Sequence, residues 1–335
     1  MRQTFNRLNL MTLALTFVLI VLGAYVRLSN AGLGCPDWPG CYGHIGVPDA
    51  THEVAAAEAA YPERPVEAPK AWKEMVHRYL AGIVGLLIGG LALLAWRDRS
   101  RALPRMLSLA TVAVVMVQIV FGALTVTLKV KPIIVTTHLM LGLTTLSLLW
   151  WMWLGTRGTS ATTLPKAGLL KPLSIAALAL LCGQIFLGGW TSTNYAALAC
   201  PDFPACHDSY LPKGDLGEAF KLWRGLGIDY EFGVLDTAAR ASIHLVHRYG
   251  ALALSLVLIA VAGYLLSLRR SPFTQLGVAL LAALALQVAI GVGLIHLQLP
   301  LWLADAHNAG AALLLLAVLA LNHAVWRGDV RRVAL

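Results

Sequence analysis

The sequence predicts an all-α integral membrane protein whose eight transmembrane helices form two tandem, pseudo-symmetric four-helix bundles with both termini in the cytoplasm. Three observations support this. The chain is 58% hydrophobic and only 13% charged, which is too apolar for a soluble domain. Eight apolar stretches follow one another along its 335 residues, and its two halves share an internal repeat.

Each apolar stretch is long enough to cross about 30 Å of hydrocarbon as a helix. The first is too long for a signal-peptide core, and its C-terminal end belongs to the repeat, so we expect it to remain in the protein as a helix. The eight spans are expected near 10–28, 74–96, 105–128, 133–154, 171–193, 241–267, 273–298 and 301–325.

The repeat pairs the first half of the chain with the second. Segment 22–41 aligns without a gap with 187–206, and the triplet His-Arg-Tyr at 77–79 recurs at 247–249. Each half contains four of the expected helices. We therefore predict two domains, 1–158 and 159–335, derived from one duplicated unit.

Basic residues indicate how the chain crosses the membrane. Arginines cluster at the termini and in the short even-numbered loops, as in the run of four between 97 and 105. The positive-inside rule places these segments in the cytoplasm and the two long loops, 29–73 and 194–240, on the outer side. The net charge of +9 is then explained by topology, and no nucleic-acid partner is expected.

Each long outer loop contains the motif Cys-Pro-Asp-aromatic-Pro-small-Cys. Outside the cytoplasm such a pair can oxidise, so we expect disulfides between Cys35 and Cys41 and between Cys200 and Cys206. Two roles are open for each disulfide. A short disulfide ring can stabilise the loop, or, if it is strained, it can take part in thiol–disulfide exchange. The first loop also contains a Pro/Ala/Glu-rich stretch, 48–70, that could cover a site as a flexible or helical segment.

Four histidines occupy equivalent places in the two halves. His77 and His138 are 61 residues apart, and His247 and His307 are 60 apart, each near the outer end of an expected helix. Two imidazoles facing each other across a four-helix bundle can ligate a heme iron from both sides. A hydrogen-bonded packing role is the alternative for any single histidine, and copper is not excluded by residue type, but polar residues inside a membrane favour function.

The two halves differ beside the first histidine of each pair. Glu74 precedes His77 by three residues on one helix face, whereas His244 takes that place before His247. A carboxylate beside a heme can act as a base, a proton relay or a stabiliser of positive charge. The alternative is an acidic residue favoured by the dipole at a helix start.

These motifs together resemble the heme A synthases of bacteria and mitochondria over essentially the whole chain. The resemblance rests on Gly-Ala-Tyr-Val-Arg at 23–27, the first cysteine loop, Glu74-x-x-His77-Arg78, Thr137-His138, His247-Arg248 and Asp305-Ala-His307-Asn308. It implies an oxidoreductase of the bacterial inner membrane, with its long loops in the periplasm. It also implies that the enzyme converts the C8 methyl group of heme O to a formyl group in two successive two-electron steps.

The resemblance further implies a division of labour. Glu74 would be catalytic, His77 and His138 would ligate the substrate heme O, and His247 and His307 would ligate a resident heme b. The membrane lipid, a heme O synthase and an unidentified electron acceptor are the expected partners, and a homo-oligomer is possible.

Three arginines near the outer surface, Arg27, Arg78 and Arg248, could contact heme propionates or could simply extend to the lipid headgroups.

Three other functions compete with heme A synthesis. A diheme b-type cytochrome would transfer electrons from quinol to an outer partner, a membrane thiol oxidoreductase would work through the cysteines, and a transporter would move heme.

Overall fold

The computed structural model describes residues 1–156 and 167–330, and all regular secondary structure in them is helical. Eight helices are long and apolar enough to cross a membrane, which confirms the predicted all-α membrane class. Two short helices, α2 (Thr51–Ala60) and α7 (Leu216–Ala219), lie in the long loops. The long helices are α1 (Arg2–Leu28), α3 (Ala68–Arg97), α4 (Arg105–Thr127), α5 (Pro132–Thr156), α6 (Ala167–Thr193), α8 (Thr237–Ser267), α9 (Ser271–His296) and α10 (Leu301–Val330).

Several helices begin earlier than the hydropathy pattern predicts. Helix α3 starts at Ala68 rather than 74, with a proline in its first turn, and α1 starts at Arg2 rather than 10. Hydropathy marks only the apolar part of a helix, whereas hydrogen bonding continues through charged turns that project beyond the hydrocarbon. Glu74 is consequently the seventh residue of its helix and does not lie in the first turn.

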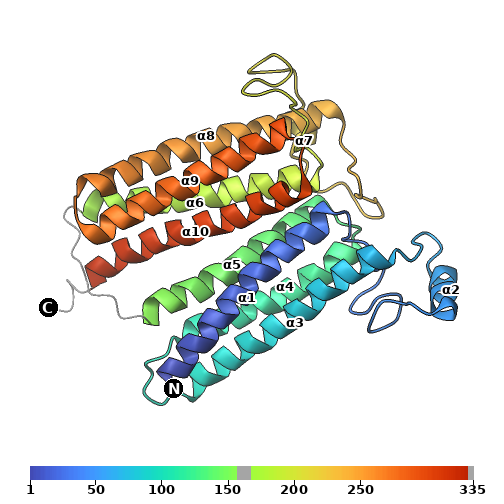
Figure 1. Cartoon of the computed structure of the whole chain (residues 1–335), viewed down its shortest axis with the longest axis horizontal. Helices are drawn as coiled ribbons and strands as arrows, with labels where there is room; N and C mark the ends of the chain where they lie inside the picture. Colours follow the sequence, from blue (N-terminus) through green and yellow to red (C-terminus); the bar gives the residue numbers. More distant parts are fainter. Residues whose placement is uncertain (157–166, 331–335) are drawn as a thin grey trace.

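The long helices pack as two rings of four (Figure 1). In the first, α1 contacts α3 and α5, while α4 closes the ring between them; in the second, α6, α8, α9 and α10 repeat this arrangement. The long loops with α2 and α7 lie at one end of the molecule, which we call the outer end after the predicted topology, and the N-terminus lies at the other (Figure 1). The predicted domain boundary at 158/159 falls outside the described residues.

Contacts between the rings follow a pseudo-twofold relationship. Helices α5 and α10, which are equivalent in the repeat, contact each other, and α1–α10 contacts are mirrored by α5–α6 contacts. At the outer end, Arg27 donates to the carbonyl oxygen of its repeat equivalent, Ser192, at 2.8 Å. Asn30 accepts a 3.0 Å hydrogen bond from its own equivalent, Tyr195. The two halves of the duplicated sequence therefore form two bundles that face each other.

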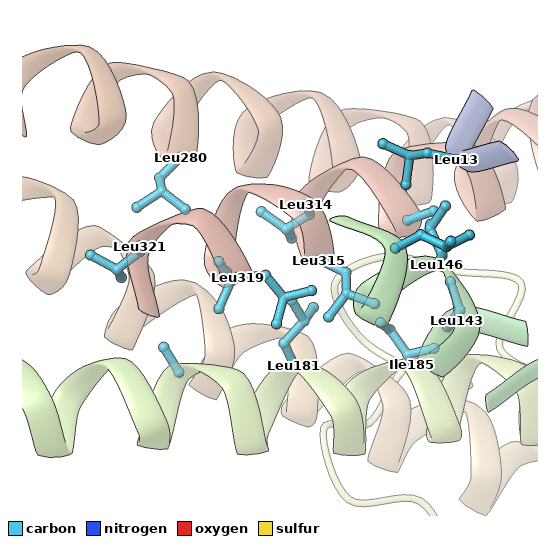
Figure 2. Packing of buried hydrophobic residues seen from close by; sticks show 14 of the residues in the cluster. Leu13, Leu143, Leu146, Leu181, Ile185, Leu280, Leu314, Leu315, Leu319 and Leu321 are labelled. Carbon is cyan, nitrogen blue, oxygen red and sulfur yellow. The ribbon is translucent and has the colours of Figure 1, made fainter. Parts of the chain in front are cut away.

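The main apolar core occupies the end of the bundles away from the long loops. It includes Leu13, Leu143 and Leu146 of the first bundle and Leu181 and Leu314 of the second (Figure 2). All five are less than 7% exposed. No residue of this core cluster comes from the outer ends of the helices, in particular from 21–28, 71–83, 132–138, 241–253 or 301–310. The main cluster thus ends before the level of the four histidines, and smaller clusters such as that of Trp190 and Ile243 pack the bundles nearer the long loops.

Polar contacts lock the two bundles to each other along their length. Near the middle, the indole nitrogen of Trp150 in α5 donates to the carbonyl oxygen of Leu316 in α10 at 2.9 Å. Closer to the outer end, the hydroxyl groups of Thr136 and Thr193 are 3.3 Å apart. Such bonds have no competing water in a bilayer, so they specify which helix faces meet.

The outer loops also reach across from one bundle to the other. Arg64 of the first loop forms ion pairs with Asp229 and Glu231 of the second. Partial burial alone would lower the pKa of the Arg64 guanidinium, but the two carboxylates reverse this and hold its pKa above the ordinary value. Lys131, which follows α4, is buried against Trp223 with its Nζ 3.5 Å from the ring centroid.

The Trp150 contact gives a stability prediction. Trp150→Phe keeps most of the ring but removes the indole N–H, so we expect the unfolding free energy to fall by about 1 kcal/mol. The measurement is the unfolding midpoint of the purified protein in nanodiscs. Trp302→Phe is the control, because Trp302 is exposed on α10, and its midpoint should stay at the value of the unchanged protein. Equal midpoints for both variants would contradict the role of this bond.

Candidate functional site

Each of the four histidines lies near the N-terminal end of its helix, between the seventh and the eleventh residue. His77 is on α3, His138 on α5, His247 on α8 and His307 on α10. All four side chains are half-buried although they sit within helices that form the bundles. Each bundle thus contains two of the histidines, His77 with His138 in the first and His247 with His307 in the second.

Each imidazole faces a glycine on the neighbouring helix. A Cβ atom added to Gly23 would lie 2.8 Å from Cε1 of His77, and one on Gly122 would lie 3.4 Å from Cε1 of His138. The second bundle repeats this, with 3.3 Å between Gly188 and His247 and 3.1 Å between Gly291 and His307. The glycines leave the space that an aromatic ring needs beside a helix backbone.

Three of the four imidazoles have a buried ring nitrogen without a partner. The Nδ1 atoms of His77, His138 and His307 are buried and make no hydrogen bond. Unpartnered polar atoms are costly in an apolar bundle unless a further group satisfies them. The glycines, the buried Nδ1 atoms and the pairs of imidazoles fit a flat ligand bound by nitrogen donors.

Glutamines support the histidine-bearing helices. Gln118 Nε2 donates to the carbonyl oxygen of His138 at 3.1 Å, and Gln287 Nε2 donates to that of His307 at 3.0 Å. Gln184 also donates to a carbonyl oxygen, that of His247, and its Nε2 is 3.0 Å from the Nδ1 atom of the same histidine. None of these three glutamines was predicted from the sequence as part of the site.

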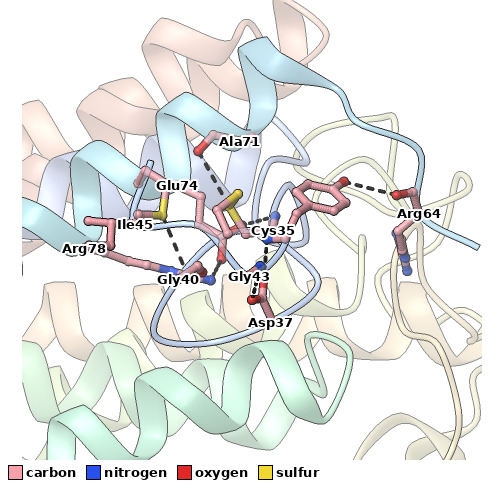
Figure 3. Close-up of a disulfide and its surroundings, with 12 residues drawn as sticks. Cys35, Asp37, Gly40, Gly43, Ile45, Arg64, Ala71, Glu74 and Arg78 are labelled. Atoms are coloured by element: carbon pink, nitrogen blue, oxygen red, sulfur yellow. Dashed lines mark hydrogen bonds and ion pairs between the residues drawn. A yellow bond between two sulfur atoms is a disulfide. The ribbon is translucent and has the colours of Figure 1, made fainter. Parts of the chain in front are cut away.

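Glu74 ties α3 to the first disulfide loop (Figure 3). Its Oε2 accepts a 3.0 Å hydrogen bond from the backbone N–H of Cys35, and its Oε1 forms a 2.5 Å ion pair with Arg78. The residue is 5% exposed. Both carboxylate oxygens thus have protein partners, and the helix-dipole interpretation loses its basis, because the first turn of α3 contains no acidic residue.

His244 takes the same position in the second bundle. Its Nδ1 lies 3.2 Å from the backbone nitrogen of Cys200, and its Nε2 lies 3.3 Å from Nε of Arg248. A carboxylate in one bundle and an imidazole in the other therefore perform the same structural task. The two side chains differ in charge and in the protons that they can donate or accept, although both contact the first cysteine of their disulfide loop.

The repeated His-Arg-Tyr triplet connects each candidate ligand to its disulfide loop. Arg78 donates to the carbonyl oxygen of Pro39 at 3.1 Å, and the Tyr79 hydroxyl donates to that of Ile45 at 2.6 Å. In the second bundle Arg248 donates to Ala205 and Tyr249 donates to Tyr210. The histidine of the triplet turns into the bundle while the next two residues hold the loop above it.

The disulfide loops have the same internal structure. The structure joins Cys35 to Cys41 and Cys200 to Cys206. The aspartate of the motif explains the turn that follows: Asp37 accepts from the backbone of Tyr42 and Gly43, and Asp202 accepts from His207 and Asp208. These backbone hydrogen bonds, first of all that from Asp208, hold the pKa of Asp202 below its ordinary value.

Comparison with known proteins decides the family. The model of the COX15-CtaA family, described as cytochrome oxidase assembly protein, matches residues 6–319. The chain is 43% identical over 322 residues to the heme A synthase of Shewanella oneidensis, covering 94% of both chains. It is also 28% identical to the heme A synthase of Rhizorhabdus wittichii, covering 94% of this chain and 92% of the relative.

The chain belongs to the COX15-CtaA family of cytochrome oxidase assembly proteins. The family match extends over all four histidines, both cysteine pairs and Glu74, so the repeated site lies within the shared region.

Of the arginines predicted to meet propionates, all three have protein partners in this family member. Arg78 and Arg248 hold the disulfide loops, and Arg27 bonds Ser192 with its guanidinium 4.3 Å from the ring centroid of Tyr195. Arg27 therefore belongs to the contact between the two bundles. Contact with propionates stays a prediction for each of them.

The contacts of Glu74 and His244 predict a selective effect on disulfide reduction. Glu74→Ala leaves the Cys35 N–H without its acceptor, so the loop should open more often and the Cys35–Cys41 bond should be reduced faster, about tenfold for a lost bond of about 1.4 kcal/mol. His244→Ala should do the same only to Cys200–Cys206. Timed reduction by dithiothreitol, followed by alkylation and peptide mass spectrometry, measures each bond separately. Equal acceleration of both bonds by either variant would contradict these separate roles.

Proposed function

We propose that this chain is a heme A synthase, which oxidises the C8 methyl group of heme O to a formyl group. The observation that carries the proposal is the pair of matching sites, each with two imidazoles facing glycines, combined with one difference between them, Glu74 against His244. Two binding sites for the same kind of ligand with different polar neighbours suit an enzyme that holds one heme as substrate and another as cofactor.

On this proposal the first bundle binds heme O through His77 and His138. The second bundle binds heme b through His247 and His307, and that heme supplies one-electron transfer. The glycines opposite the imidazoles let each ring lie against the backbone of the neighbouring helix, so these four histidines would hold the two hemes by a ring nitrogen, and the buried Nδ1 atoms of His77, His138 and His307 have no competing partner.

The chemistry removes four electrons and four protons in two equal steps. The methyl carbon loses two electrons and a proton and gains a hydroxyl group from water, which releases a second proton. The alcohol is oxidised in the same way to a gem-diol, which loses water and leaves the formyl group. The electrons go to an acceptor outside the bundles, and the enzyme's membrane position favours one in the lipid or at the outer surface.

Glu74 is the side chain best placed to assist this reaction, since it lies three residues before His77 on the same helix face. A carboxylate there stabilises positive charge that develops at the methyl carbon and accepts a proton from the attacking water. Because its oxygens are bonded to Cys35 and Arg78, movement of the disulfide loop would change how strongly it can do so. The proposal therefore connects the loop with the rate of the reaction.

The proposed function is tested by converting heme O with purified protein and analysing the products by liquid chromatography and mass spectrometry. Glu74→Gln keeps the side-chain size but removes the charge, so we expect formation of the alcohol and of heme A to fall at least about 100-fold. His244→Gln is the matched control in the second bundle and should retain most of the rate. Heme A formation by Glu74→Gln at the rate of the unchanged protein would remove the catalytic role of Glu74.

The same assay separates the competing functions. A diheme cytochrome would contain tightly held heme b in both bundles and would yield no alcohol and no heme A. A thiol oxidoreductase would lose activity with Cys35→Ser and keep it with His247→Ala, whereas a heme A synthase should lose it with His247→Ala. A heme transporter would release heme O unchanged.

A further inference from the structure

The two bundles differ at a second pair of equivalent positions, beside the first histidine of each pair. Gln184 of α6 places its amide Nε2 3.0 Å from Nδ1 and 3.5 Å from Nε2 of His247. The repeat aligns Gln184 with Leu19 of α1. Leu19 packs against the apolar core and offers no polar atom to His77. Only the second bundle therefore has a side-chain partner for the ring of this histidine.

A glycine in the second bundle makes room for this amide. Gly250 lies one turn after His247, and a Cβ added to it would overlap Oε1 of Gln184 and lie 3.2 Å from Cδ1 of Leu187. The repeat aligns Gly250 with Leu80, one turn after His77. Both positions thus change together, from glutamine and glycine in the second bundle to two leucines in the first.

The consequence is visible in the hydrogen bonds of the imidazoles. Nδ1 of His77 is buried without a partner, whereas Nδ1 of His247 has one. In this arrangement Nε2 of Gln184 faces Nδ1 as a donor and also bonds the carbonyl oxygen of His247. The acceptor that a metal-bound imidazole needs for its Nδ1–H is Oε1, which is buried without a partner and comes to face the ring when the amide turns and gives up its bond to the carbonyl. A second hydrogen bond at the far ring nitrogen fixes the orientation of a metal-binding histidine and strengthens its binding.

We propose that Gln184 is a positioning residue that fixes the His247 imidazole and makes the second bundle a permanent heme holder, while Leu19 leaves His77 free to release its heme. The inference rests on the proposed function in one respect, namely that both histidine pairs bind heme. It adds the side-chain difference that gives the two sites different rates of heme release. A substrate site must release its product after each cycle, whereas a cofactor site must keep its heme.

The test measures heme release from each bundle by itself, in the full chain in nanodiscs. The double variant His77→Ala/His138→Ala isolates the second site, and His247→Ala/His307→Ala isolates the first. Each protein is mixed with excess apomyoglobin, and heme transfer is followed by absorbance. Electron paramagnetic resonance of the ferric heme reports the orientation and hydrogen bonding of its histidines, which a general loss of stability does not shift.

In the second site we expect Gln184→Leu to release heme b about 10- to 100-fold faster, which is the range found when a metal ligand loses its second hydrogen-bond partner. The electron paramagnetic resonance signal of the bound heme should shift as well. Gly250→Ala displaces the same amide without removing it and should act in the same direction. Gln184→Glu restores an acceptor for the ring and should return slow release. In the first site, Leu19→Gln/Leu80→Gly should slow release about tenfold.

Asn322→Leu in the second site is the control, because it removes a buried amide that bonds the backbone of Ser174, far along α10 from His307. It should leave the resonance of the bound heme unchanged. Release from Gln184→Leu at the unchanged rate with an unchanged resonance would overturn the inference. If release rates change as expected but heme O is never converted, the proposed function fails and this inference stands; if the second site binds no heme at all, both fail.

Discussion

Four imidazoles inside apolar helix bundles are the constraint on which the rest of the structure depends. Polar rings at this depth are costly unless another group uses their nitrogens, and they need room that a closely packed core does not leave. The chain meets both needs at the outer ends of the bundles, where the main apolar core stops and a glycine faces each ring. The inner ends supply the packing that holds the helices in place (Figure 2).

The disulfide loops are tied to the helices that carry the first histidine of each pair. In each half a helix residue accepts the backbone N–H of the first cysteine, and the arginine and tyrosine after the histidine hold the loop from below. Arg64 (Figure 3) then joins the first loop to the second through its ion pairs with Asp229 and Glu231. The position of each loop is thus coupled to the helix that carries the first histidine of each pair.

Much of this was predictable from periodicity and repetition. The eight spans and the duplication follow from hydropathy and from motifs such as His-Arg-Tyr, whose recurrence also identified the histidines. The helix starts were missed because charged turns hide them, and Gln184 was missed because its equivalent is Leu19, so repetition gave no signal. The loop-holding role of Glu74 depends on a contact with Cys35, 39 residues away, which no local pattern reveals.

The most direct test of the account is the heme composition of two variants purified from a host that makes heme O. His77→Ala should retain heme b and lack heme O, the alcohol and heme A, because only the second site is intact. His247→Ala should lose heme b while heme O remains bound in the first bundle. Loss of the same heme from both variants, or heme b alone in each, would contradict the division of the two bundles into a substrate site and a cofactor site.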